Sequence, residues 1–140
     1  MVALKLPLVD DYIVEGDWTY ETGNLTMQKL LSLADPPSAV IAANDATAAG
    51  AMHCIHEQGY FVPGDISMVG FDNIERSANI FPRLTTIDVE LASIDRIACL
   101  HLFGTMENVG GVNCRIVVPV RLVERDSVGP VKKGYFLEPD

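Results

Sequence analysis

Four short stretches of the chain are rich in β-branched and other apolar residues, and each has the length of one strand. They lie at residues 11–16, 38–44, 65–71 and 115–123. Apolar runs with little alternation are typical of strands that are covered on both faces, as in a parallel sheet. We therefore predict four strands, and the segment TTIDVE at residues 85–90 is expected to be extended as well.

Helical spacing of apolar residues fills the intervals between these strands. Leucines recur at this spacing before Pro36-Pro37, which predicts a helix that ends at the prolines. A second helix is predicted after residue 44, with Asp45 as its N-cap and Gly59 as the left-handed residue beyond its end. A third is predicted from Leu91 onward, ended by Gly104 and the pair Gly110-Gly111.

The alternation of strands and helices predicts the fold class. Right-handed β-α-β units give an α/β fold with a mostly parallel sheet flanked by helices. Residues 129–140 contain glycine, proline and charges without a period, so we expect a loosely ordered tail after a domain at residues 1–128.

Composition narrows the classes of function. The 140 residues are 49% apolar and carry 10 basic against 19 acidic side chains, a net charge of −9. This charge repels phosphate backbones and anionic lipids, so we expect neither nucleic-acid nor membrane binding by the chain itself. An odd count of three cysteines fits reduced, structural thiols. Without a recognisable secretory signal, the expected location is the cytoplasm.

Polar residues follow two of the predicted strands directly. Asn44 and Asp45 come after residues 38–43, and Asp72 and Asn73 come after residues 65–71. In an open α/β sheet, ligands bind outside the carboxyl ends of the strands. Amides and carboxylates there suit neutral polyhydroxyl or amide-bearing ligands. The alternatives are a helix N-cap at Asp45 and an Asx turn at Asp72 and Asn73.

Enzyme, cofactor and metal motifs are not evident in the sequence. It contains no glycine-rich dinucleotide fingerprint, no Walker A motif and no nucleophile elbow. His53 and His56 are three residues apart on a predicted helix, but no cysteine or paired carboxylate completes a metal site. We predict a non-enzymatic protein with no cofactor and no metal.

Five ordered segments carry a resemblance to a known family. They read EGDWTYETGN, PPSAVIAANDATAAGAM, VPGDISMVGFDN, PRLTTID and IVVPVRLVERDSV, and together they cover nearly the whole chain. In this order they resemble the C-terminal effector-binding region of the LacI/GalR family of bacterial transcription regulators. The resemblance implies part of a two-lobed, type I periplasmic-binding-protein-like domain, which closes around a small effector such as a sugar, a sugar derivative or a nucleobase.

The resemblance also implies which residues contact the effector. By motif, Asn44 and Asp72 stand at effector-contacting positions, and Trp18 matches an aromatic residue that stacks on the ligand. From the residues alone, Trp18 is either a core aromatic or a flat platform for a ring, and the core reading is favoured. Leu91 stands where some relatives carry an effector-facing ring, and its aliphatic side chain removes that stacking. Asn73 is expected to support the loop.

A two-fold dimer is a further implication of the resemblance, because relatives use the helix after the A-N-D motif and the loop after G-F-D as an interface. The residues at these positions are Ala49, Met52, His53, His56 and Ile80. The alternative is that the apolar members of this set face the chain's own sheet.

The resemblance implies the effector-sensing and dimerisation portion of a cytoplasmic regulator, which would contact DNA only through an N-terminal headpiece that does not precede Met1. Because the N-terminal lobe is also absent, residues 1–128 are expected to form an incomplete effector-binding domain that binds its effector weakly. One alternative is part of a periplasmic-type sugar-binding transport protein, which needs a signal peptide. The other is a small α/β enzyme with Asp72 as base, for which no partner nucleophile is evident.

Overall fold

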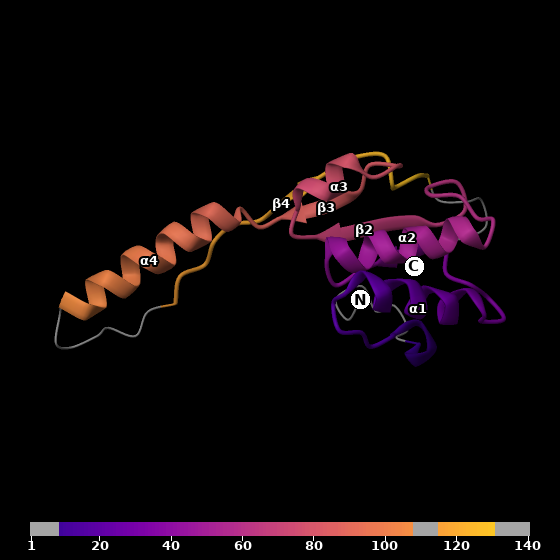
Figure 1. Ribbon diagram of the computed structural model, residues 1–140, viewed down its shortest axis with the longest axis horizontal. Coiled ribbons are helices and arrows are strands. Elements are labelled where there is room, and N and C mark those ends of the chain that lie inside the picture. The colour runs from indigo at the N-terminus through magenta and orange to yellow at the C-terminus, as the bar shows by residue number, and fades with distance from the viewer. Residues whose placement is uncertain (1–8, 108–114, 131–140) are drawn as a thin grey trace, which may run out of the picture.

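A four-stranded sheet organises the computed structural model, which describes residues 9–107 and 115–130. Its strands are β1 (Ala39–Ile41), β2 (Ser67–Phe71), β3 (Thr85–Asp88) and β4 (Arg121–Val123), and they lie side by side in chain order. The first three run parallel, and β4 is antiparallel to β3. The predicted α/β class with a mostly parallel sheet is therefore confirmed (Figure 1).

Two helices, α1 (Tyr20–Leu31) and α2 (Asp45–Glu57), pack against each other on one face of the sheet (Figure 1). Their contact is close because Gly23 and Gly50 lie at the crossing. A Cβ on Gly50 would lie 1.9 Å from the carbonyl oxygen of Tyr20, and one on Gly23 would lie 2.1 Å from that of Thr47. Both helices were predicted, and Gly59 has the expected positive φ of 80° after α2.

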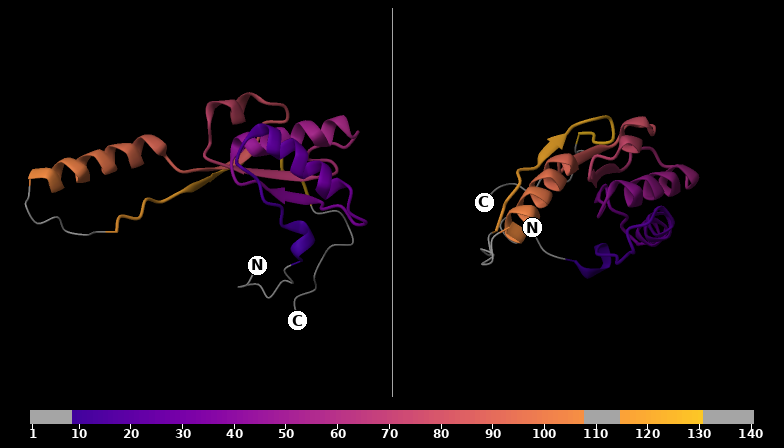
Figure 2. Two further views of the ribbon diagram at one scale, coloured as in Figure 1. Left: turned by 60° about the horizontal axis from the view of Figure 1, so that its bottom comes forward. Right: turned by 60° about the vertical axis from the view of Figure 1, so that its left-hand side comes forward.

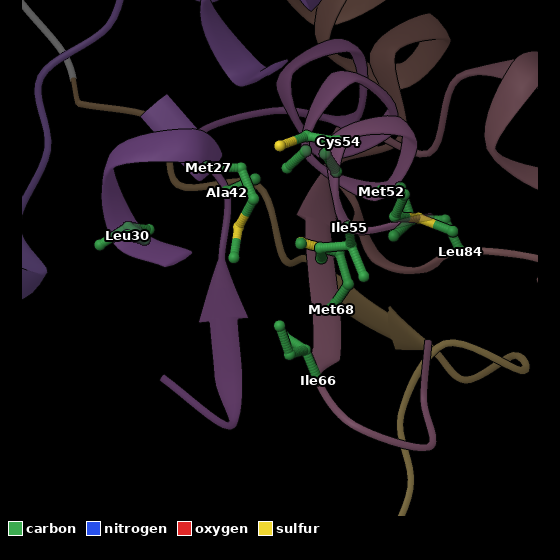
Figure 3. Close-up of a cluster of buried hydrophobic side chains, with 11 residues drawn as sticks. Met27, Leu30, Ala42, Met52, Cys54, Ile55, Ile66, Met68 and Leu84 are labelled. Atoms are coloured by element: carbon green, nitrogen blue, oxygen red, sulfur yellow. The ribbon is translucent and has the colours of Figure 1, made fainter. Parts of the chain in front are cut away.

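The hydrophobic core lies between these two helices and the sheet. Met27 of α1, Ile55 of α2 and Met68 of β2 belong to it, together with Leu30 of α1 and Ala42 after β1 (Figure 3). The stripe of Ala48, Met52 and Ile55 that the sequence predicts along α2 is buried as expected. Cys54 is also buried, and this burial raises the pKa of its thiol.

The two remaining α-helices, α3 and α4, differ in length and in their position relative to the sheet. α3 (Glu75–Asn79) is a single short helix after β2. α4 (Leu91–Glu107) projects away from the sheet as an arm (Figures 1 and 2). Gly104, which was predicted to end this helix, lies inside it, and Cys99 on the same helix is exposed, not buried. Gly110-Gly111 and Cys114 lie outside the described residues.

Two strand predictions are corrected by the structure. Residues 11–16 form no strand: a short 3₁₀ helix, η2 (Asp10–Tyr12), is followed by irregular backbone that pairs with no described strand. Of residues 115–123, only Arg121–Val123 pair, because β3 is only four residues long and offers no partner to the earlier ones. Apolar composition alone does not make a strand when the neighbouring strand is not there.

Candidate functional site

Three polar residues lie at the carboxyl ends of the parallel strands. Asn44 follows the end of β1, Asp72 comes directly after β2, and Asp88 is the last residue of β3. Because the three strands run parallel, these residues belong to one edge of the sheet. The sequence analysis expected Asn44 and Asp72 at this edge but did not include Asp88. Together they put an amide and two carboxylates where ligands of open α/β sheets bind.

Asn44 builds the start of α2. It is the N-cap residue, because its Oδ1 accepts a hydrogen bond from the Thr47 N–H at 2.8 Å. Its Nδ2 donates to the carbonyl oxygen of Trp18 at 3.0 Å. The sequence prediction that Asp45 caps the helix was wrong. Asn44 is the residue that leaves the strand in extended conformation, and only such a residue can aim its side chain at the first turn.

Asp45 is a buried structural acid, with 1% of its surface exposed. Its Oδ2 accepts from the Ile74 N–H at 2.9 Å, and its Oδ1 accepts from the Thr86 hydroxyl at 2.5 Å. These bonds tie the start of α2 to β3 and to the turn after β2. Gly70 leaves room for the carboxylate, since a Cβ there would lie 2.3 Å from Asp45 Oδ1.

Asp72 lies in the turn after β2, and its carboxylate has no hydrogen-bond partner among the described residues. Its backbone has φ of 102°, followed by 55° at Asn73, and its N–H donates to the Ile87 carbonyl at 2.9 Å. Within residues 9–107 and 115–130, no hydrogen bond holds its half-buried side chain. Burial raises the pKa of Asp72, and the charge of Asp45 adds to this. A desolvated acid without a partner is a ready acceptor for ligand hydroxyls.

Arg125 holds the turn beside Asp72, a role that the sequence analysis missed. Its Nη2 donates to Asn73 Oδ1 at 2.6 Å, and its Nη1 donates to the Leu84 carbonyl at 2.7 Å. Asn73 therefore supports the loop, as expected, and leaves the rim to Asp72. An arginine in the run that follows the final strand is the only signal that the sequence offers for this contact.

A salt bridge fixes the third carboxylate of the rim. Arg121 Nη2 lies 2.8 Å from Asp88 Oδ2, and the Glu90 N–H donates to Asp88 Oδ1 at 2.9 Å. The Glu90 N–H, and after it the Arg121 side chain, lower the pKa of Asp88. Asp88 is thus bound by its neighbours, which leaves Asp72 as the rim acid open to a ligand.

Trp18 presents an open aromatic surface near the rim. Its backbone has φ of 70°, and its side chain is 71% exposed, so it is not a core aromatic. Asn44 anchors the backbone of Trp18 through its carbonyl oxygen, as described above.

The neighbouring Asp17 accepts from the hydroxyls of Thr22 and Thr19, which lowers the pKa of Asp17 to about 2. Leu91, the first residue of α4, is 53% exposed beyond the end of β3.

The five residues assigned to a dimer interface divide into two groups. Ala49 and Met52 are buried within the chain itself. His53 and His56 are exposed on α2, where His53 Nε2 lies 3.2 Å from Glu57 Oε1, and Ile80 is half-buried against the core. Of these five residues, only the two histidines and, in part, Ile80 are accessible at the surface.

A hollow of about 900 Å³ lies beside the site but not on Asp72. It is lined by residues 35–43, which include β1, by the segment from Tyr12 to Trp18, and by residues of α1 and α2. Of the rim residues described above, it includes only Trp18, and its walls are mostly apolar. This hollow is therefore distinct from the rim where the uncommitted acid stands.

Other kinds of site find no support in the described residues. Within 9–107 and 115–130, no three His, Cys, Asp or Glu side chains gather as metal ligands. Of the helices in the same part of the chain, none has the length and apolarity needed to cross a membrane.

Comparison with known proteins gives consistent similarities. The model of the periplasmic binding protein-like domain family matches residues 3–128. The HTH-type transcriptional repressor CytR of Escherichia coli K12 is 40% identical over 113 residues, which are 76% of this chain and 33% of CytR.

Solved structures of transcriptional regulators are also similar to this chain. The transcriptional regulator LacI of Bacillus cereus subsp. cytotoxis NVH 391-98 is 27% identical with a TM-score of 0.90, over 94% of this chain and 46% of that one. A LacI family regulator of Enterococcus faecium with bound ribose is 29% identical with a TM-score of 0.76, over 82% and 42%. The chain spans 33% to 38% of the length of these curated relatives.

Proposed function

Because the chain belongs to the periplasmic-binding-protein-like effector-binding family of LacI-type regulators, we propose that it senses a small polyhydroxyl molecule at the rim formed by Asn44 and Asp72. The effector is a sugar or a nucleoside. The observation that carries this proposal is the half-buried Asp72 carboxylate, which no described neighbour occupies, since a carboxylate of this kind accepts two hydroxyl hydrogens.

Trp18 and Leu91 supply the apolar part of the proposed contact. An exposed indole offers a flat surface to the apolar face of a sugar ring or to a base. Asn44 ties down the backbone of Trp18 through its carbonyl oxygen and has a second lone pair on Oδ1 for a ligand hydroxyl. Bound ribose in the E. faecium relative supports a sugar as the ligand class.

In the whole protein, effector binding shifts the population between two arrangements of the regulator. We propose that it acts as a cytoplasmic homodimer, which contacts its second copy through the exposed histidines of α2 and through Ile80. DNA is bound through a headpiece outside this chain. The relatives named above are transcriptional regulators, and no enzyme is among them, which supports a non-enzymatic role.

The affinity of this chain alone should be low. When one lobe supplies about half of the contact free energy, a micromolar site of about −8 kcal/mol falls to about −4 kcal/mol, or a Kd of about 1 mM. Titration of the 140-residue chain with D-ribose, D-glucose and adenosine, followed by NMR, tests this. We expect saturable shifts at the Asp72 carboxyl and the Trp18 indole for at least one ligand.

Two variants control this titration. Asp72→Asn should abolish the shifts, whereas Asp95→Asn, at an exposed acid on α4, should preserve them. Absence of any saturable shift at about 50 mM ligand would reject the rim as the effector site. Tight binding, with a Kd below about 1 µM, would reject the idea that the chain holds only half of the cleft.

A further inference from the structure

Two arginines near the end of the described chain reach the neighbours of Asp72. Arg121 lies in β4, which borders β3 on the side away from β2 (Figure 1), and Arg125 follows shortly after the strand ends. Arg121 donates to Asp88 Oδ2 through Nε at 3.1 Å and through Nη2 at 2.8 Å. Arg125 Nη2 donates to Asn73 Oδ1 at 2.6 Å. Both arginines therefore hold the residues around the open acid and leave the acid itself free.

Asn73 joins these two contacts. Its side-chain amide also bonds to the Asp88 carboxylate, and this bond adds to those of the Glu90 N–H and Arg121 in lowering the pKa of Asp88. The result is a continuous chain of polar contacts, Arg121–Asp88–Asn73–Arg125, which we call the rim clamp. The rim clamp begins and ends on residues 121–125 and passes through the residue directly after Asp72.

The turn that the rim clamp holds has a strained backbone. Asp72 and Asn73 have φ of 102° and 55°, in a region that residues other than glycine rarely adopt. Such conformations persist only where the surroundings hold them in place. The backbone of the turn is tied to the Ile87 carbonyl before it and to Asp45 after it. Between these two ties, the side chain of Asn73 is what connects the turn to the rest of the fold.

Arg125 has the contacts of a fixed anchor. Its Nη1 donates to the Leu84 carbonyl at 2.7 Å and to Ser77 Oγ at 3.2 Å, and its backbone N–H donates to Thr85 Oγ1 at 2.9 Å. These acceptors set the direction of the planar guanidinium, so that Nη2 stays aimed at Asn73. A lysine carries the same charge, but its single ammonium group cannot reproduce this spread of bonds.

We propose that Arg125 is a positioning residue for effector recognition, which holds Asp72 at the rim through its bond to Asn73. This role rests on the proposed function of the rim. It adds that the effector acid is tied to the segment after β4, so that a change in this segment alters the affinity for the effector. Arg125 does not touch the effector in this arrangement and acts only through the turn.

NMR of the 140-residue chain without effector tests the rim clamp. A positive φ gives a strong nuclear Overhauser effect between the amide and α protons of one residue, which the parent should show at Asp72 and Asn73. Arg125→Lys should weaken both signals and lower the pKa of Asp72 towards its ordinary value, because the loosened turn exposes the carboxylate to water. Arg83→Lys is the matched control and should change neither, since Arg83 binds Asp126. Unchanged signals and an unchanged pKa in Arg125→Lys would overturn the proposal, even if that variant loses stability.

Asn73→Gly keeps the proposal testable if Arg125→Lys does not fold. Glycine adopts a positive φ freely but offers no side chain to the rim clamp. We therefore expect the pKa of Asp72 to fall in this variant as well. A pKa equal to that of the parent would show that the backbone alone holds the turn, and the proposal would be wrong.

Titration with D-ribose gives the functional readout. If the loosened turn occupies its binding-competent form about a tenth of the time, the apparent Kd rises about 10-fold. We expect this rise in Arg125→Lys and in Asn73→Gly, and no rise in Arg83→Lys. The double variant should bind no more weakly than either single variant, because both changes break the same bond. Additive effects would overturn the proposal. Absence of ribose binding by the parent would instead reject the proposed function, and the two measurements without effector would still decide the role of Arg125.

Discussion

Replacement of Asp45 tests the coupling between the buried acid and the open acid at the rim. Asp45→Ala leaves two buried donors, the Ile74 N–H and the Thr86 hydroxyl, without acceptors. A buried unsatisfied donor costs about 1–3 kcal/mol, so the alanine variant should lose about 3–5 kcal/mol of unfolding free energy. Asp45→Asn keeps one carbonyl oxygen for Ile74, and its amide can donate to the Thr86 oxygen.

The asparagine variant should therefore lose only about 1–2 kcal/mol, the difference between charged and neutral hydrogen bonds. Both variants remove a negative charge that raises the pKa of Asp72, so in both the pKa of Asp72 should fall. Urea unfolding at pH 7 gives the free energies, and a carbon-13 NMR titration of the Asp72 carboxyl gives the pKa.

The raised pKa of Asp72 makes its own effect on stability depend on pH. Because its pKa is raised in the folded chain, its contribution to stability is fully present below the pKa of the unfolded chain and is lost as pH rises through the folded value. Asp72→Asn should therefore be more stable than the parent at pH 7. Equal losses in Asp45→Ala and Asp45→Asn, or an unchanged pKa of Asp72 in Asp45→Asn, would refute the coupling.

Two further predictions concern the helix crossing and the turn before α1. Gly50→Ala should lower the free energy of unfolding by at least about 2 kcal/mol in urea, because the new Cβ meets the backbone of α1. Gly104→Ala in α4, whose Cβ meets nothing within 4 Å, should raise it by about 0.5–1 kcal/mol. Equal effects of the two variants would contradict the close helix crossing. Thr22→Val removes the main hydroxyl donor to Asp17, so the pKa of Asp17 should rise from about 2 towards its ordinary value in an NMR titration. At pH values above its ordinary pKa, ionised Asp17 stabilises the fold, and this contribution is lost as the pH falls towards 2. Between these pH values the Thr22→Val variant should therefore lose less stability than the parent chain.

The shared edge of the sheet could be predicted because the polar residues directly follow strands that the sequence shows. A strand followed by an amide and a strand followed by an acid bring the two groups to one edge when the strands run parallel, and β1 and β2 do run parallel. Which of two adjacent residues caps α2 could not be read, since Asn44 and Asp45 are both good caps and only the backbone angles separate them.

Contacts between distant segments escaped prediction for a different reason. Arg125 reaches Asn73 across 52 positions in the chain, and no spacing in the sequence signals that bond. The predicted strand at residues 11–16 failed because strand formation depends on a neighbour, and the described sheet ends at β1.

The pH dependence of D-ribose binding tests the central claim most directly, namely that the Asp72 carboxylate is the group that receives the effector. The account predicts that affinity rises as pH increases through the pKa of Asp72 in the folded chain and that ribose lowers this pKa, because only the ionised form accepts two hydroxyls. An affinity that is constant from pH 4 to pH 8, or one that persists in Asp72→Asn, would contradict it.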